Sequence, residues 1–248
     1  MADSEIKFSI VTATYNSANV LPRLIASLKD QTDQCFEWVV ADGASTDGSL
    51  ALLEAAKDIL KISIDSRADF GVYDALNRAV RIAKGDYYLV VGADDQLSPD
   101  AVRLYKKNCL DTKADLVTAN IEFGEKIIGV RRHRYEWLEG QFAHVSGHAV
   151  GLAIKKSLHK KYGYYSNKFP IAADQLFILN VIHCGGVVHE CDFIAGKFGL
   201  DGLSSTDSLG SLLESYRVQC LVGHGFIVQT TLLLLRIIKN IRKLRNCR

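Results

Sequence analysis

Short apolar runs alternate with amphipathic segments along the N-terminal part of the chain. Four of the runs are rich in β-forming residues: 8–14, 36–41, 62–65 and 87–91. The segments between them place apolar residues on one face of a helix: 20–29, 49–60 and 74–84. Strands that alternate with helices are typical of a parallel sheet with crossover helices, so the pattern predicts an α/β protein.

Each of the four predicted strands stops at a polar cluster. The clusters are 14–16, 42–47, 66–69 and 94–95. The carboxyl ends of parallel strands lie along one edge of a sheet, and ligands of open α/β proteins bind there. Helix capping can explain any one of these clusters, but it does not explain why all four fall at strand ends. We therefore expect a ligand site at this edge.

Asp94 and Asp95 directly follow the apolar run at 87–91. Two adjacent carboxylates repel each other, so their close approach favours a cation beside them. Mg²⁺ or Mn²⁺ takes one or two carboxylates together with phosphate oxygens, which points to a metal-bound diphosphate. The alternative is that the pair caps the next helix, since residues 98–100 (Ser-Pro-Asp) form a helix start.

The pattern loosens after residue 95. Further elements are predicted as a helix at 100–109, a strand pair at 115–123 and 127–130, and a short helix at 155–159. The segment 131–148 carries Arg and His among aromatic residues, so it is either a phosphate- or sugar-binding loop or a loop with solvated charges. Asp174 introduces an apolar helix, where its default role is the N-cap. His183 and His189 are metal ligands by residue type, but isolated histidines are more often structural.

Composition excludes several classes of protein. The net charge of +2 gives no bulk attraction to nucleic acid. Six cysteines are scattered without a CxxC pair, which favours free thiols in a reducing compartment over a disulfide framework or a zinc site. The N-terminus shows no basic region followed by an apolar stretch, so no secretory signal is predicted and we expect a cytoplasmic protein.

With these residues in place, the chain resembles a family-2 glycosyltransferase of the GT-A fold, of the kind that builds bacterial polysaccharide and O-antigen repeat units. The resemblance covers about 8–205 and rests on the blocks SIVTATYNSA, VVADGASTDGS, DFGVYDALNRAVRIAKGDYYLVVGADD, IAADQ and FGLDGLSS. It implies a Rossmann-like, mostly parallel sheet flanked by helices. The domain at 1–205 would have a nucleotide-binding half at about 1–97 and an acceptor half at about 98–205.

The resemblance also implies roles for single residues. Asp95 would bind Mn²⁺ or Mg²⁺, Asp94 would contact the ribose or the donor sugar, and Asp174 would be the catalytic base. The other implied donor-site residues are Thr12, Thr14, Asn16, Asp42, Arg67 and Asp69.

Within this donor set, the two threonines and Asn16 would line the nucleotide pocket. Asp42 would accept a hydrogen bond from the base or ribose, and Asp69 would sit beside the base and diphosphate. Arg67 stands where the family often has an acidic residue, and it could instead face a phosphate.

The implied reaction is inverting, hexosyltransferase-type transfer from a nucleotide-diphosphate sugar, with a UDP-sugar favoured, to a hydroxyl of a glycan or lipid-linked oligosaccharide. A metal neutralises the departing diphosphate, and Asp174 takes the proton of the acceptor hydroxyl. Two departures from the family pattern concern ligand contacts. Gly92-Ala93 replaces a frequent Asn-Ser, and Gly147-His148-Ala149 stands where His-Gln is common.

The C-terminal segment at 206–248 is basic and amphipathic. No acidic residue follows Glu214, and the apolar run at 226–235 is too short to span a bilayer. From residue 234 on, apolar side chains share one helical face opposite basic ones, which is typical of a helix that lies on an anionic membrane surface. The alternative is a helix that packs on the catalytic domain or on a second copy of the chain.

Two other functions fit acidic residues at strand ends. A metal-dependent nucleotidyltransferase or phosphohydrolase is one, but a nucleotidyltransferase would normally carry a glycine-rich basic loop after the first strand, and residues 14–17 (Thr-Tyr-Asn-Ser) are no such loop. A non-catalytic partner subunit that binds membrane or glycan is the other. The four carboxylates of Asp42, Asp69, Asp95 and Asp174 argue against it, because a lapsed site has no physical need for them.

Overall fold

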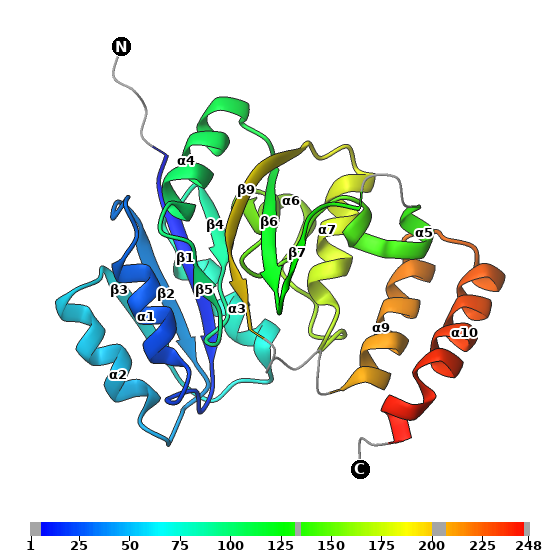
Figure 1. Ribbon diagram of the computed structural model, residues 1–248, viewed down its shortest axis with the longest axis horizontal. Helices are drawn as coiled ribbons and strands as arrows, with labels where there is room; N and C mark the ends of the chain where they lie inside the picture. Colours follow the sequence, from blue (N-terminus) through cyan, green and yellow to red (C-terminus); the bar gives the residue numbers. More distant parts are fainter. Residues whose placement is uncertain (1–5, 132–134, 200–206, 246–248) are drawn as a thin grey trace.

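The computed structural model describes residues 6–131, 135–199 and 207–245. They form an α/β structure built on a nine-stranded sheet that is covered by helices on both faces (Figure 1). The strand order is β3-β2-β1-β4-β8-β6-β9-β5, and β7 pairs with β6. The α/β class predicted from the sequence is confirmed.

Four parallel strands make up the N-terminal half of the sheet. Their bounds are β1 Phe8–Thr14, β2 Glu37–Asp42, β3 Ile62–Ser66 and β4 Tyr87–Val90. β1 lies between β2 and β4, β3 pairs with β2, and all three ladders are parallel. The carboxyl ends of the four strands therefore share one edge, and the polar clusters that follow them line up along it.

Side chains of these strands alternate between two cores, as the two-residue period of a strand requires. Ile10 belongs to one core and its neighbour Val11 to the other. The first core is covered by α1 Leu21–Lys29, α2 Ser49–Ala55 with the 3₁₀ turn η1 Ala56–Asp58, and α4 Ala101–Thr112. The second core is covered by α3 Val72–Ile82, α6 Leu158–Tyr162 and α7 Ala173–His183.

The second half of the sheet is mixed. Its strands are β5 Gln96–Leu97, β6 Leu116–Phe123, β7 Lys126–Ile128, β8 Leu152–Lys155 and β9 Val188–Phe198. β8 is antiparallel to β4 and β6, and β9 runs parallel to β6. The sequence pattern does not predict β9, because Glu190, Asp192 and Gly196 interrupt its apolar residues.

The short helix predicted at 155–159 is wrong at its start. Lys155 is the last residue of β8 and pairs with Tyr87 of β4, and α6 begins at Leu158. The backbone N–H of Lys156 donates to the carbonyl of Asp86, which keeps the chain extended past the strand end. Pairing with β4 thus delays the helix by one turn.

The remaining helices lie at one end of the molecule. They are α5 Glu136–Glu139, the 3₁₀ turn η2 Gly140–Ala143, α9 Ser208–Leu221 and α10 Phe226–Arg245. α9 and α10 lie side by side beyond α7 and α5 (Figure 1), and Val218 of α9 is buried in the second core. Among the described residues, no helix combines the length and the apolar character needed to cross a membrane.

Candidate active site

A cleft of ≈ 610 Å³ opens at the carboxyl edge of the sheet. Its wall includes the last residue of β4 and the segment that follows it, 90–95, the segment 146–149 after η2, and the start of α7. Asp94, Asp95 and Asp174 all line this cleft although they are far apart in sequence. The fold thus brings the expected metal-side carboxylates and the expected base to one cavity.

Asp95 is buried at the base of the cleft, with 1% of its surface exposed. Its Oδ2 accepts from the backbone N–H of Gly92 at 2.6 Å, and its Oδ1 accepts from Gly199 at 2.7 Å. Burial raises the pKa of Asp95 to about 7. The two N–H bonds lower this pKa, whereas the charge of Asp94 raises it. A cation that replaces the proton is therefore favoured at this carboxylate.

Two glycines make room for the carboxylate pair. A Cβ at Gly199 would lie 2.0 Å from Asp94 Oδ2, and a Cβ at Gly92 would lie 3.0 Å from an oxygen of Asp94 and of Asp95. Neither aspartate caps the next helix, because β5 intervenes and α4 begins at Ala101. Two carboxylates held in a backbone cradle fit a hard cation such as Mg²⁺ or Mn²⁺, which also takes phosphate oxygens.

A buried arginine organises the strand ends on the nucleotide side. The Arg78 side chain on α3 is 6% exposed, and its guanidinium lies 3.2 Å from the Asp65 carboxylate and 3.4 Å from that of Asp69. It also donates to the carbonyl of Asp42 at 3.2 Å. Arg67 is mainly exposed and lies 3.4 Å from the Asp65 carboxylate. Arg78 thus ties the end of β2 to β3 and to the loop that carries Asp69.

Asp42 is fully buried at the end of β2. Its Oδ2 accepts from the Ser66 hydroxyl at 2.7 Å and from the backbone N–H of Ser45 at 3.0 Å. A Cβ at Gly43 would lie 2.8 Å from Asp69 Oδ2, so this glycine lets the chain pass close to Asp69. Asp42 and Asp69 therefore lie together along the sheet edge next to the cleft, where a nucleotide would extend from the Asp94 side.

The loop after β1 joins the same edge. Asn16 has a φ of 47°, and its Oδ1 accepts from the backbone N–H of Thr46 at 2.9 Å. Thr14 Oγ1 is buried and has no hydrogen-bond partner within the described part of the chain, and Thr14 is not among the residues that line the cleft. Thr12 is not brought to the cleft: it is buried in β1 and accepts from the Trp38 indole N–H at 3.0 Å.

Asp174 lies in the first turn of α7, and the cleft reaches its carboxylate. The Tyr73 hydroxyl donates to Asp174 Oδ1 at 2.6 Å, and Gln141 Nε2 lies 3.5 Å from Oδ2. Tyr73 thereby fixes one carboxylate oxygen and leaves the other to react.

Asp174 is not the N-cap of α7, which was its default role. The N-cap residue is Ala172. Glu214 of α9 accepts from the backbone N–H groups of Ile171 and Ala172, at 2.9 Å each. Because Glu214 satisfies these donors from another helix, the Asp174 carboxylate is free to serve the cleft.

A chain of close polar contacts runs from Asp174 into the second core. His148 Nδ1 lies 3.8 Å from Asp174 Oδ2, and His148 Nε2 lies 2.7 Å from the Tyr165 hydroxyl. The Tyr165 and Tyr88 hydroxyls are 2.6 Å apart, and Tyr88 lies 2.7 Å from His159 Nε2. The base is thus connected to a row of buried rings.

The carbonyl of Gly163 sets the direction of the protons in this row. It lies 2.9 Å from His159 Nδ1 and can only accept, so that nitrogen carries the proton. Burial lowers the pKa of His159 to about 4, so the ring is neutral and its Nε2 accepts from Tyr88. Tyr88 must then accept from Tyr165, and Tyr165 must accept from His148 Nε2.

Sequence reasoning missed Tyr73, Arg78 and Glu214. Tyr73 and Arg78 carry a weak signal in the sequence. Tyr73 lies three residues before Leu76 and Arg78 three residues after Ala75, which places both on the buried side of α3. Glu214 carries none, because its partners at the start of α7 are distant in sequence.

Some expected features fall elsewhere. Most of the FGLDGLSS block, and residues 132–134 of the basic segment, lie outside the described residues. His189 Nε2 lies 3.2 Å from Asn108 Oδ1, away from the cleft.

Comparison with known families agrees with this geometry. The family described as Glycosyl transferase family 2 matches residues 9–183, which is more than half of the chain. The chain belongs to glycosyl transferase family 2. The expected family and enzyme class, a glycosyltransferase, are thus confirmed.

Curated relatives of this family 2 chain match it over part of their length. A "PGL/p-HBAD biosynthesis glycosyltransferase" of Mycobacterium tuberculosis is 44% identical over 92 residues, which cover 36% of this chain and 36% of that protein. A "Poly(ribitol-phosphate) beta-glucosyltransferase" of Bacillus spizizenii is 28% identical over 186 residues, or 71% of this chain and 29% of that protein. The matches thus span about a third of each relative.

Solved structures confirm the GT-A fold. S. aureus TarS 1-349 in complex with UDP-GlcNAc superposes with a TM-score of 0.73 at 21% identity, over 88% of this chain and 65% of that one. The mannosyltransferase PcManGT of Pyrobaculum calidifontis, in complex with GDP-Man and Mn²⁺, gives a TM-score of 0.68 at 18% identity, over 86% and 63%. The family 2 chain thus has an α/β GT-A-like sheet followed by C-terminal helices.

Proposed function

We propose that this family 2 protein is an inverting, metal-dependent transferase that moves a hexosyl group from a nucleotide-diphosphate sugar to an acceptor hydroxyl. One observation carries the proposal: Asp94 and Asp95 share a single cleft with Asp174. A nucleotide-sugar transferase needs both kinds of carboxylate, one pair beside the diphosphate and one base beside the acceptor. Thr14, Asn16, Asp42 and Asp69 lie along the same edge and supply contacts to the nucleoside.

A UDP-sugar is the favoured donor. The TarS structure contains UDP-GlcNAc and superposes over most of this chain. The PcManGT structure contains GDP-Man, so the fold accommodates either base. The choice between them rests on the residues at the ends of β1 to β3, and the experiment below compares both nucleotides.

Asp95, assisted by Asp94, would hold Mn²⁺ or Mg²⁺. The metal supplies Lewis-acid stabilisation of the charge that develops on the departing diphosphate. The Mn²⁺ in the PcManGT complex supports this assignment. Asp94 would also reach the ribose or the donor sugar.

Asp174 would act as the general base. Its Oδ1 is fixed by Tyr73, so its Oδ2 is the oxygen that takes the proton of the acceptor hydroxyl. The deprotonated oxygen attacks the anomeric carbon from the face opposite the diphosphate, which inverts the configuration there. Base catalysis of this kind contributes about 10²- to 10⁴-fold to the rate.

The acceptor would be a glycan or a lipid-linked oligosaccharide used in bacterial surface polysaccharide synthesis, such as that of O-antigen. The poly(ribitol-phosphate) acceptor class in the name of the Bacillus relative supports a cell-surface polymer. The transferase domain would comprise 1–205, and the helices of 206–248 would serve its location.

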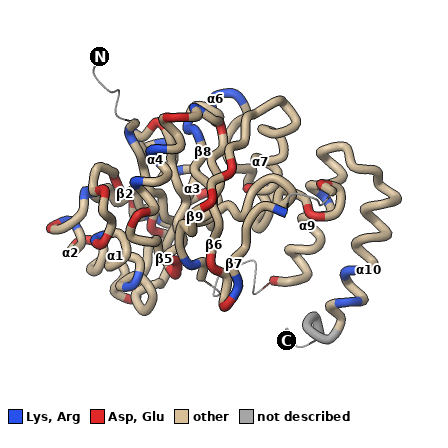
Figure 2. The backbone as a smooth tube through the Cα atoms, turned by 45° about the horizontal axis from the view of Figure 1, so that its top comes forward, with Lys and Arg blue, Asp and Glu red and all other residues tan. Residues whose placement is uncertain are grey.

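The C-terminal helix α10 would place the protein on the inner face of the cytoplasmic membrane. Ile227, Leu234 and Ile238 are 80%, 57% and 65% exposed. Figure 2 shows Lys and Arg but no acidic residue along α10. On its other side, Gln229 of α10 donates to the carbonyl of Trp137. α10 therefore packs on the protein through polar contacts, which include Arg236, and leaves an apolar surface with Lys239 exposed beside it. Such a surface suits anionic lipid.

Calorimetric titration of UDP and of GDP, with and without Mn²⁺, tests the donor site. We expect Mn²⁺-dependent binding of UDP, which Asp95→Ala abolishes. Asp174→Asn should retain this binding while transfer from a UDP-sugar falls about 10²- to 10⁴-fold. Asp111→Asn, on the exposed face of α4, is the matched control and should change neither. Near-normal transfer by Asp174→Asn, or absence of nucleotide binding under all conditions, would contradict the proposal.

A further inference from the structure

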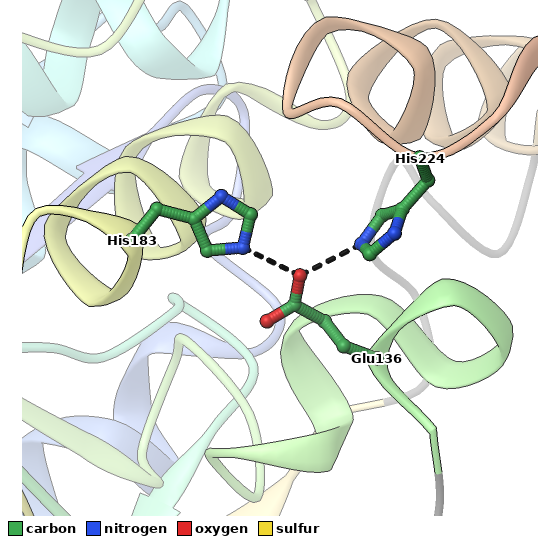
Figure 3. Close-up of side chains that lie close together, drawn as sticks. All are labelled: Glu136, His183 and His224. Atoms are coloured by element: carbon green, nitrogen blue, oxygen red, sulfur yellow. Dashed lines mark hydrogen bonds and ion pairs between the residues drawn. The ribbon is translucent and has the colours of Figure 1, made fainter.

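Three histidine rings converge on the carboxylate of Glu136 between α7 and the C-terminal helices. The Nε2 atoms of His183 and His224 lie 2.6 Å and 2.7 Å from Glu136 Oε1, and that of His144 lies 2.6 Å from Oε2. Figure 3 shows His183 and His224 approaching the carboxylate from opposite sides, from α7 and from the turn before α10, with Glu136 on α5. These four residues are called the Glu136 cluster below.

The Glu136 cluster is separate from the proposed transferase site. None of its members is among the residues that line the cleft with Asp95 and Asp174. A single ion pair is enough to join two helices, whereas here three rings from three segments direct the same nitrogen, Nε2, at one carboxylate. This is the composition of a ligand set, and the transfer reaction makes no use of it.

We propose that the Glu136 cluster binds a transition-metal dication of the Zn²⁺ class. Imidazole nitrogens of His183 and His224 suit Zn²⁺ and, with a Glu136 oxygen, give three ligands. His144, which contacts the other carboxylate oxygen, or a water molecule would take the fourth tetrahedral position. Mg²⁺ and Mn²⁺ prefer oxygen ligands, so the Asp95 site and this site select different ions. No cysteine belongs to the Glu136 cluster, so the spacing of the cysteines in the sequence does not indicate this site.

The geometry needs a small adjustment to hold the ion. One ligand atom each from Glu136, His183 and His224 already lie within 4.8 Å of one another. Around a tetrahedral Zn²⁺ with bonds of about 2.0–2.1 Å, ligand atoms stand about 3.3 Å apart. The N–O contacts of 2.6–2.7 Å would therefore open by about half an ångström, and the two rings would draw together around the ion. A ring that binds the metal through the Nε2 lone pair carries its proton on Nδ1.

The side chains are accessible enough for an ion to enter. The exposed fractions are 17% for Glu136, 30% for His144, 36% for His183 and 21% for His224. The three rings belong to neither hydrophobic core, so they can shift toward an ion without disturbing either.

The metal would fasten the C-terminal helices to the catalytic helix. α7 is held by these helices at both of its ends. At its start, Glu214 of α9 accepts from the backbone two residues before Asp174. At its end, His183 meets His224 of the α9–α10 turn through Glu136. An ion at the Glu136 cluster would thus fix the position of α9 against the helix that carries the base.

Titration of Co²⁺ into the EDTA-treated full-length protein tests the site. Co²⁺ in a tetrahedral site with nitrogen ligands gives a strong visible absorption band, unlike Co²⁺ in an octahedral oxygen site. We expect this band to saturate at one ion per chain and to disappear on addition of Zn²⁺. Zn²⁺ at a hundredfold excess over its Kd should also raise the Tm by about 5–10 °C.

Variants identify the ligands. His183→Ala and His224→Ala should each lose the band, and Glu136→Gln, which keeps the size of the side chain, should weaken Co²⁺ binding at least about tenfold. His189→Ala, which bonds to Asn108 elsewhere, and Asp95→Ala should both keep the band. Two results would overturn the proposal: no tetrahedral band in the wild-type protein, or an equal band in His183→Ala and His224→Ala. A Tm that responds to pH but not to Zn²⁺ would likewise show a cluster that binds only protons.

Discussion

His148 turns its Nδ1 toward Asp174 Oδ2 at a distance of 3.8 Å, with its Nε2–H committed to Tyr165. Because the proton order is set from the carbonyl of Gly163, neutral His148 has a lone pair on Nδ1. Burial lowers the pKa of His148, and the charge of Asp174 partly opposes this effect, so the ring is neutral near pH 7. His148 Nδ1 is thus a basic nitrogen next to the proposed base, and it can share the proton that Asp174 takes.

His148→Gln tests this sharing. A glutamine amide can still donate to the Tyr165 hydroxyl, but it offers no basic nitrogen to Asp174. We expect kcat to fall about tenfold to a hundredfold with the nucleotide Kd unchanged. The acid limb of the pH–rate profile should move to lower pH, because a proton shared by two groups is held more tightly than one on Asp174 alone.

Tyr165→Phe tests the proton order. It removes the acceptor that holds the proton on His148 Nε2, so the proton can move to Nδ1 and donate to Asp174, and the acid limb should again move to lower pH. An acid limb in His148→Gln that overlays the wild-type curve would contradict proton sharing.

The raised pKa of Asp95, about 7, predicts how metal binding depends on pH. Asp95 must lose its proton to bind Mn²⁺. Affinity for Mn²⁺ in the presence of UDP should therefore fall about tenfold for each pH unit below 7 and level off above it. Titrations at several pH values measure this slope.

Asp95→Asn is the control for this prediction. The amide carries no proton to displace, so any residual Mn²⁺ binding should be weak and independent of pH between 5 and 8. A wild-type affinity that is flat over the same range would exclude Asp95 as the titrating ligand.

The first half of the fold could be predicted because its strands are buried on both faces. Such strands are continuous apolar runs, and their carboxyl ends define the ligand edge without knowledge of any contact. β9 could not be predicted, since it carries Glu190 and Asp192 and owes its place to pairing with β6.

The candidate site shows the same division. The acidic residues follow strands or start a helix, so local pattern and family resemblance were enough to select Asp95 and Asp174. Arg78, Glu214 and the Glu136 cluster depend on contacts between segments far apart in sequence. His183 is an isolated histidine in the sequence, and its partners Glu136 and His224 come together only in the folded structure.

Arg78 is predicted to support both stability and nucleotide binding. Arg78→Met would leave the partly buried carboxylate of Asp69 and the carbonyl of Asp42 without their cationic partner, and it would leave Asp65 with only the exposed Arg67. We expect the free energy of unfolding to fall by about 3 kcal/mol in urea titrations. The Kd for UDP with Mn²⁺ should rise, because the loop that holds Asp69 loses its anchor.

Arg81→Met on the same helix is the matched control. Arg81 is exposed and lies over the Tyr164 ring at 4.4 Å, so its loss should cost less than about 1 kcal/mol and leave the Kd unchanged. Equal effects of the two substitutions would show that Arg78 contributes no more than a surface cation.

The exposed face of α10 is predicted to bind anionic membranes. Leu234 is 57% exposed, and a charge there would remain in water in the free protein but would enter the lipid interface in the bound state. Leu234→Glu should therefore weaken binding to vesicles with anionic lipid about tenfold or more, as measured by vesicle sedimentation. Leu110→Glu introduces the same change at a half-exposed leucine on α4, remote from α10, and should weaken binding only by its effect on net charge. Equal loss of binding in both variants would show that the attraction is due to net charge alone. The role of α10 would then be to pack on the catalytic domain.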